Sequence, residues 1–302
     1  MRVIDILTSP WAVVPDKLFE IQSIYSRHLR GEKIDLKALE AKLGQPLQNE
    51  PQGYEAIDGV AIVSVDGVMS KKMNLFSKIS GGASTELIGR DFRAALVDPA
   101  VHAIILRIDS PGGSVDGTME LAQMIHAARG QKPIVALADG MAASAAYWVA
   151  SAADKVYVSS ATTAVGSIGV VAAHTDYSEA EKSAGIRVTE IYAGQFKRIA
   201  SEHKPLSEEG RQYMQDTVDH LYSIFVTEVA KHRGSDPETV HKNMADGRIF
   251  IGQQAIDAGL VDGVSTLDQL IADMGASQIA ERQRAAALRA LNATLTAAPV
   301  RA

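Results

Sequence analysis

Three short stretches of the sequence combine residue types that could carry out a reaction. The first is Asp-Ser-Pro-Gly-Gly at 109–113, where paired glycines can leave backbone N–H groups open to an anion. The second is Ser144 within the Ala-rich stretch 139–150, and the third is Lys197 in a Gly-Gln-Phe-Lys segment. A hydroxyl, a candidate base and an anion-binding turn are the parts that nucleophilic acyl transfer requires.

Each stretch also has a plain structural interpretation. Pro-Gly-Gly can be a tight strand-to-helix turn, Ser144 can lie in a packed Ala-rich helix, and Lys197 can be a surface lysine. Asp139-Gly140 is expected to be the turn that ends an apolar run, and good helix formers follow it. Ser144 is therefore predicted at a helix start just after a strand, where free backbone N–H groups can meet negative charge.

A serine becomes a nucleophile only with the help of a base, and histidine is the usual one. Of the eight histidines, only His174 and His203 fall in predicted loops near the candidate site. A Ser-His-Asp triad with either of them stays open, although no local motif supports it. A lysine can serve instead if burial lowers its pKa from about 10.4 towards roughly 7–8.

Strand-like and helix-like segments alternate around these stretches. Together they predict βαβ units and an α/β core with a parallel sheet. The expected strands are 60–68, 101–108, 134–138, 155–158, 187–192 and 249–251. The expected helices are 86–96, 116–129, 142–153, 176–184, 207–233 and a short one from Asp236-Pro237, with a mobile loop at 70–83.

The chain divides into three expected regions. Residues 1–50 read as a helical leader, with helical spacing at 15–30 and a second short helix at 35–43. The stretch 51–275 forms the main domain, and 276–302 is an Ala/Arg-rich tail that we expect to be flexible.

Composition excludes several classes of protein. The 302 residues carry a net charge of -6, which argues against a dedicated nucleic-acid binder. There is no cysteine, so disulfides, Cys-ligated zinc and thiol nucleophiles are excluded. No run approaches the ~18 apolar residues of a membrane helix, and no signal peptide is visible. These features predict a cytoplasmic protein without a membrane anchor.

Four motifs in one order resemble the signal peptide peptidase family of Ser-Lys serine proteases, in the Clp protease/crotonase fold superfamily. They are Asp-Ser-Pro-Gly-Gly at 109–113, Asp-Gly-x-Ala-Ala-Ser-x-x-Tyr at 139–147, Val-Gly-Ser-Ile-Gly-Val at 165–170 and Gly-x-Phe-Lys at 194–197. The resemblance covers about residues 60–264 and implies a fold of stacked ββα units.

The family pattern implies a role for each matching residue. Ser144 would be the nucleophile and Lys197 the general base, with Ser167 orienting the lysine. The backbone N–H groups of Gly113 and Ala145 would form the oxyanion hole, and Gly112 would shape the turn. Ala145-Ala146 stands where the family often has Gly-Gly, a mild departure because alanine still supplies the N–H. No metal and no cofactor are needed.

The length and the helical leader resemble the phage head maturation branch of the family. The resemblance implies a capsid assembly protease that cleaves scaffold, portal or capsid proteins, in the host cytoplasm or inside the prohead, and that forms a homo-oligomer. A soluble bacterial signal-peptide-peptidase-like protease that degrades peptides is the near alternative. A crotonase-type acyl-CoA enzyme and a non-catalytic assembly protein are more distant, and the crotonase interpretation gives Lys197 no role.

Overall fold

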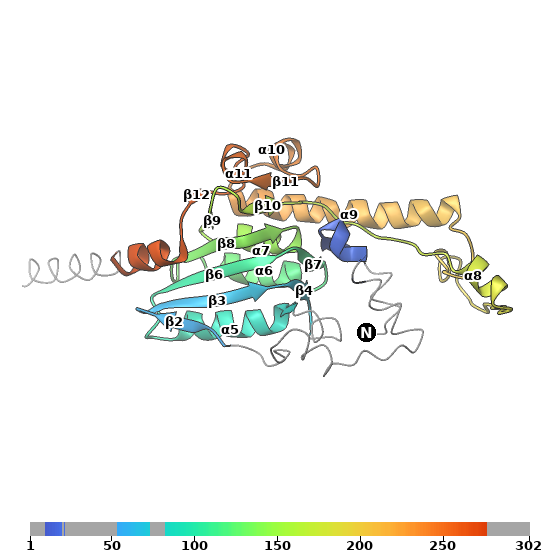
Figure 1. Cartoon of the computed structure of the whole chain (residues 1–302), viewed down its shortest axis with the longest axis horizontal. Helices are drawn as coiled ribbons and strands as arrows, with labels where there is room; N and C mark the ends of the chain where they lie inside the picture. The colour runs from blue at the N-terminus through green and yellow to red at the C-terminus, as the bar shows by residue number, and fades with distance from the viewer. Residues whose placement is uncertain (1–9, 20, 22–52, 73–81, 277–302) are drawn as a thin grey trace, which may run out of the picture.

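The computed structural model describes residues 10–19, 21, 53–72 and 82–276 (Figure 1). Two sheets and the helices packed on them make up an α/β fold, as the sequence predicts. The larger sheet has the order β11-β10-β8-β6-β3-β2, with β9 and β12 joined beside β8. The smaller sheet has the order β1-β7-β4-β5.

The strands of the larger sheet are β2 (Glu55–Ile57), β3 (Val60–Asp66), β6 (Ala103–Ser110), β8 (Ile134–Ala143), β9 (Lys155–Val158), β10 (Ala164–Gly166), β11 (Ile249–Ile251) and β12 (Gly263–Val264). The smaller sheet contains β1 (Trp11–Val13), β4 (Val68–Ser70), β5 (Gly82–Ser84) and β7 (Gly112–Ser114). The helices are α5 (Thr85–Val97), α6 (Thr118–Ala127), α7 (Ala145–Ser151), α8 (Ser178–Ser183), α9 (Glu208–Arg233), α10 (Pro237–Asn243) and α11 (Gln253–Asp257).

The central strands β3, β6 and β8 run parallel, and they are apolar on both faces because helices cover both faces. Helices α5, α6 and α7 cover one face and form the main core with it (Figure 1). On the other face Val60, Ile105 and Leu137 pack with Leu270 and Ile271, which belong to a helical segment at 267–276. The parallel sheet and buried helices confirm the predicted fold class.

Helix termini follow their local sequence. Ser84 caps α5 by accepting from the N–H of Leu87, and Ser207 caps α9 by accepting from the N–H of Gly210. Asp236 caps α10 in the same way, with a proline in the first turn. These capped helices lie where the sequence predicts them.

The structure corrects the prediction that Asp139-Gly140 ends a strand. Strand β8 continues to Ala143, because Gly140 adopts a φ of 120° and the side chain of Asp109 accepts a hydrogen bond from the N–H of Met141 at 3.1 Å. The pairing with β6 shifts register here but continues at Ala142 opposite Ser110. On the other edge of β8, β9 pairs with residues 135–138 and β10 pairs with the last three residues. The bend carries the strand on into α7.

A second correction concerns the predicted strand at 187–192, which is irregular. Ile191 is 95% exposed and no strand lies beside this segment in the described part of the chain. Without a neighbouring strand to pair with, an apolar run does not form a strand even when its residues have high β-propensity. The segment belongs instead to residues 174–207, called the arm below, which include α8 and lie at the end of α9 distant from the sheet (Figure 1).

Other expectations fall partly or wholly outside the described residues. The predicted mobile loop at 70–83 and the C-terminal tail lie mostly there, as do the second leader helix at 35–43 and most of the one at 15–30. Residues 15–19 are helical. The sequence did not predict β1, which precedes them and pairs with β7.

Candidate active site

Ser144 lies at the junction of β8 and α7, with backbone angles φ 54° and ψ −118°. A positive φ costs a non-glycine residue of order 1–3 kcal/mol and persists only where the surroundings enforce it. Here the N–H of Ser144 donates to the carbonyl of Gly166 at 2.7 Å, and its own carbonyl accepts from the N–H of Trp148 at 3.0 Å. A sharp, strained strand-to-helix turn of this kind holds the nucleophilic serine in enzymes of the α/β-hydrolase fold.

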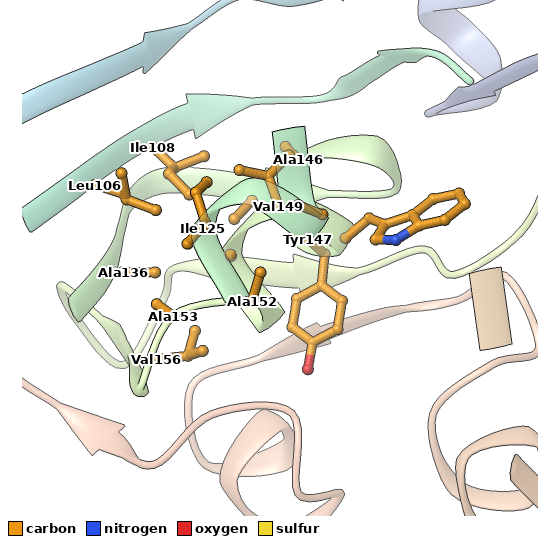
Figure 2. Packing of buried hydrophobic residues seen from close by; sticks show 14 of the residues in the cluster. Leu106, Ile108, Ile125, Ala136, Ala146, Tyr147, Val149, Ala152, Ala153 and Val156 are labelled. Carbon is orange, nitrogen blue, oxygen red and sulfur yellow. The ribbon is translucent and has the colours of Figure 1, made fainter. Parts of the chain in front are cut away.

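Helix α7 is fixed by packing along its whole length, and every one of its residues is buried. Figure 2 shows Ala146 and Val149 on the side of α7 that faces Ile108 and Ile125, whereas the Tyr147 ring points away from them. The small residues are what allow the helix to lie so close to the strands.

Two further contacts join α7 to its surroundings. The Trp148 ring stacks on Phe225 of α9, with centroids 4.4 Å apart, and the Tyr147 hydroxyl donates to the carbonyl of Leu260 at 2.8 Å. Arg129 donates to the carbonyls at the end of α7, those of Ser151 (3.0 Å), Ala152 (2.9 Å) and Ala153 (2.5 Å). The first turn of α7, with Ser144, is therefore held on a rigid element.

The predicted oxyanion turn lies beside the serine. Gly112 has a φ of 101°, and a Cβ placed there would lie 2.9 Å from the carbonyl oxygen of Ala143 and 3.0 Å from Cβ of Ser144. A Cβ at Gly113 would lie 1.9 Å from the carbonyl oxygen of Met69. Only glycine fits either position, which explains the Pro-Gly-Gly sequence.

Ser167 is the second non-glycine residue near the site with a positive φ, 50°. It is 6% exposed and its N–H donates to the carbonyl of Arg248 at 2.7 Å. It directly follows β10, whose residues Val165 and Gly166 pair with Ala142 and Ala143 just before the serine. The structure thus brings Ser144, Ala145, Gly112, Gly113 and Ser167 together from three separate stretches.

Lys197 lies elsewhere in this chain. It is in the arm, exposed, and its ammonium has no hydrogen-bond or ion-pair partner among the residues that the structure describes. The neighbouring Arg198 binds Glu190 and Glu202, and the Ser201 hydroxyl donates to Glu190 at 2.7 Å, so the arm has its own polar network. Within a single copy of the chain, Ser144 and Lys197, the two predicted members of the dyad, do not lie together.

The histidine alternatives do not reach the serine either. His174 Nε2 lies 2.9 Å from the carbonyl oxygen of Ser201, and His203 Nδ1 lies 2.7 Å from Glu181, all within the arm. Among the described residues the Ser144 hydroxyl has one hydrogen bond, to the carbonyl of Gly169 at 3.3 Å. The structure gives the triad interpretation no support.

Sequence reasoning missed the strand that lies over the site. Strand β1 pairs antiparallel with β7, so that Ala12 lies opposite Gly113 and Val13 opposite Gly112. The Cβ placed at Gly112 would lie 2.3 Å from the carbonyl oxygen of Ala12. The one sequence signal is the β-favouring Trp-Ala-Val-Val run at 11–14, directly before Pro15.

No group of three or more His, Asp or Glu side chains in the described residues could hold a metal ion. No described helix is long and apolar enough to cross a bilayer.

Two family models match the part of the chain that contains the candidate site. The family model for Clp protease matches residues 73–168, and the model for peptidase family S49 matches 126–280. The Head-tail preconnector protein GP5 of Enterobacteria phage P21 is 33% identical over 245 residues, covering 81% of this chain and 48% of that protein.

Two further relatives match about two thirds of the chain or more. The Capsid assembly protease C of Escherichia phage lambda is 33% identical over 213 residues, 70% of this chain and 48% of that protein. The Putative signal peptide peptidase SppA of Enterococcus faecium is 34% identical over 206 residues, which cover 67% of this chain and 58% of that protein. The chain spans about half the length of these curated relatives. The S49 model covers more than half of the chain, across the serine, the Ser167 turn and the lysine segment, and the chain therefore belongs to peptidase family S49.

Proposed function

We propose that the protein is a serine endopeptidase in which Ser144 is the nucleophile and Lys197 the general base. The observation that carries the proposal is the strained conformation of Ser144 beside the Gly112-Gly113 turn. The first N–H groups of a helix have no partner within the helix, so Ala145 can donate to an oxyanion from one side while Gly113 donates from the other. Ser167 directly follows β10, which pairs with the residues just before Ser144, and in this proposal it orients the base.

In the reaction Lys197, neutral, takes the proton of the Ser144 hydroxyl as its oxygen attacks a peptide carbonyl. The tetrahedral oxyanion accepts hydrogen bonds from Gly113 and Ala145, and each donor is worth about 3–4 kcal/mol in comparable sites. The lysine then protonates the leaving amine, and it activates the water that releases the acyl-enzyme.

The separation of Ser144 and Lys197 makes self-association part of this proposal. Five large apolar side chains of the arm are exposed, and covering them would be favourable. They are Ile186 at 57%, Val188 at 42%, Ile191 at 95%, Tyr192 at 49% and Phe196 at 49%. They precede Lys197 in sequence, and Phe196 is its direct neighbour, so a surface that covers them would also bury the lysine. We propose that this surface is the serine site of a second copy, which completes the dyad.

The first experiment tests the dyad with casein as substrate. Ser144→Ala and Lys197→Ala should each abolish cleavage while the folded state is kept, as judged by circular dichroism. Lys204→Ala is the matched control, because this lysine is exposed in the same arm seven residues later, and it should leave the rate unchanged. Full cleavage by either dyad variant would refute the assignment.

The second experiment tests self-association by mixing the two inactive variants. If the dyad forms between copies, a random mixture restores about a quarter of the wild-type activity, because half of the serine sites are intact and half of their neighbours carry the lysine. No recovery would show that each copy builds its own dyad. Ile191→Asp should also disrupt the assembly and its activity, whereas Val97→Asp, 79% exposed on α5, should not.

For the biological role we propose a phage or prophage capsid assembly protease, acting on scaffold, portal or capsid proteins in the host cytoplasm or the prohead. The two phage relatives named above support this, and the first of them covers most of this chain. Portal and major capsid genes beside this gene would support the role.

A bacterial protease that degrades peptides is the second candidate, supported by the likeness to the Enterococcus faecium protein. An isolated gene, without capsid genes near it, would favour this candidate. Membership of a peptidase family argues against the acyl-CoA alternative.

A further inference from the structure

Strand β1 covers the serine. Ser144 is 1% exposed although its hydroxyl has to reach a substrate, and the backbone of β1 passes directly beside it. A peptide substrate cannot approach Ser144 while residues 10–14 lie in this place.

Strand β1 is bound along both of its backbone edges. On one side it pairs with β7, and on the other the N–H of Trp11 donates to the carbonyl of Val171 at 2.8 Å, while the N–H of Val171 donates back to Trp11 at 2.8 Å. An extended peptide held between two such edges is the binding mode of strand addition, in which the main chain supplies affinity.

The pairing register shows which carbonyl meets the oxyanion turn. Antiparallel neighbours alternate between pairs that exchange backbone hydrogen bonds and pairs that do not. The N–H of Val14 donates to the carbonyl of Pro111 at 3.0 Å, which marks this as a bonding pair. The next bonding pair is Ala12 opposite Gly113, so the alternation directs the Gly113 N–H at the Ala12 carbonyl.

Successive side chains of β1 point to opposite faces, as the side chains of a bound extended peptide would. Ala12 is fully buried against the main core, whereas Trp11 and Val13 belong to the opposite face, where they pack with Leu18 and Val68. The position next to the serine is thus filled by a methyl group and has no room for a large side chain.

We propose that residues 10–14 occupy the substrate groove as a self-substrate and that the enzyme cleaves its own Ala12–Val13 bond. This proposal rests on the proposed function. The Ser144 oxygen bonds to the carbonyl carbon of Ala12, and its proton passes to Lys197. The bond to the Val13 nitrogen breaks, and that amine takes the proton from the lysine. Water then cleaves the ester, leaving a carboxylate on Ala12 and a free amine on Val13.

Self-cleavage would also open the groove. The segment that ends at Ala12 is no longer tied to the helical residues 15–19, so it can dissociate and be replaced by a substrate in trans. The same register predicts that trans substrates are cut after a small residue.

The test is to purify the full chain and to follow its intact mass and its N-terminal residue over time, with casein cleavage measured in parallel. The wild type should accumulate a species that begins at Val13, and Ser144→Ala should stay whole. Ala12→Gly should keep the cleavage, whereas Ala12→Phe should reduce it at least tenfold. Val13→Pro provides a second block that leaves Ala12 itself unchanged.

The outcomes separate this inference from the proposed function. Casein cleavage that depends on Ser144, without any species starting at Val13, would overturn self-cleavage and leave the peptidase assignment intact. A species starting at Val13 in Ser144→Ala would also overturn it, because another enzyme would then be responsible. A wild-type chain that neither cleaves casein nor produces a species starting at Val13 would refute the peptidase assignment itself.

Discussion

Acid should destabilise the protein through His232, which lies where α9 packs against α7. Its side chain is fully buried, with Nδ1 2.9 Å from the Ser151 hydroxyl, and burial followed by the positive charges of His126, Arg129 and Lys231 lowers its pKa from 6.5 to about 3. His232 is therefore neutral near pH 7, and the 3.6 Å between its Nε2 and Glu228 is not an ion pair there.

The sign of the effect follows from proton binding. The unfolded chain protonates this histidine below pH 6.5, while the folded chain does not until about pH 3, so folding stability is full above 6.5 and falls as the pH is lowered through that window. One unit of pKa difference corresponds to about 1.4 kcal/mol. Linkage then predicts that His232 alone removes about 2 kcal/mol of stability between pH 7.5 and pH 5.

The assay is urea unfolding of His232→Gln and wild type at both pH values. Glutamine can still bond to Ser151 but does not titrate, so the loss of stability between pH 7.5 and pH 5 should shrink by about 2 kcal/mol. His220→Gln is the control, since His220 is exposed on the same helix, and it should leave the pH dependence unchanged. An unchanged pH dependence in His232→Gln would refute the reasoning.

Three substitutions around the serine have distinct expected outcomes. Trp148→Ala removes the ring stacked on Phe225 and should cost about 3–5 kcal/mol in urea unfolding; a loss below 1 kcal/mol would contradict the packing account. Tyr147→Phe leaves the buried Leu260 carbonyl without its donor and should cost about 1–3 kcal/mol in the same assay, with little change in activity. Gly112→Ala should abolish casein cleavage, because its Cβ would meet backbone oxygen at 2.3 Å and 2.9 Å; wild-type activity would show that the turn is not part of the site.

Local signals were sufficient to predict much of the fold. The capped helices and the doubly apolar strands carry their information within a few residues, as Ser207 before α9 and Asp236 before α10 illustrate. The turn was recognisable from its paired glycines. The structure explains why they are there, because only glycine tolerates the close approach of the Ala143 and Met69 carbonyls.

What could not be predicted depends on contacts between distant parts of the chain. Strand β1 is only three residues long, and its role follows from pairing with residues that lie 99 to 103 positions later, which no local pattern encodes. The apolar run at 187–192 has strand propensity but no edge to pair with. The sequence near Lys197 does not predict that the arm lies away from Ser144. Because the two residues are separated in one copy of the chain, the proposal includes self-association.

The central claim is that Ser144 carries the acyl group during catalysis, and covalent trapping tests it most directly. The protein is reacted with the p-nitrophenyl ester of an acetylated Trp-Ala peptide, quenched in acid and digested, and the acylated residue is located by mass spectrometry. We predict one acyl group on the Ser144 hydroxyl and no burst of p-nitrophenol from Ser144→Ala. An acyl group on a different residue, or an undiminished burst from the variant, would contradict the account.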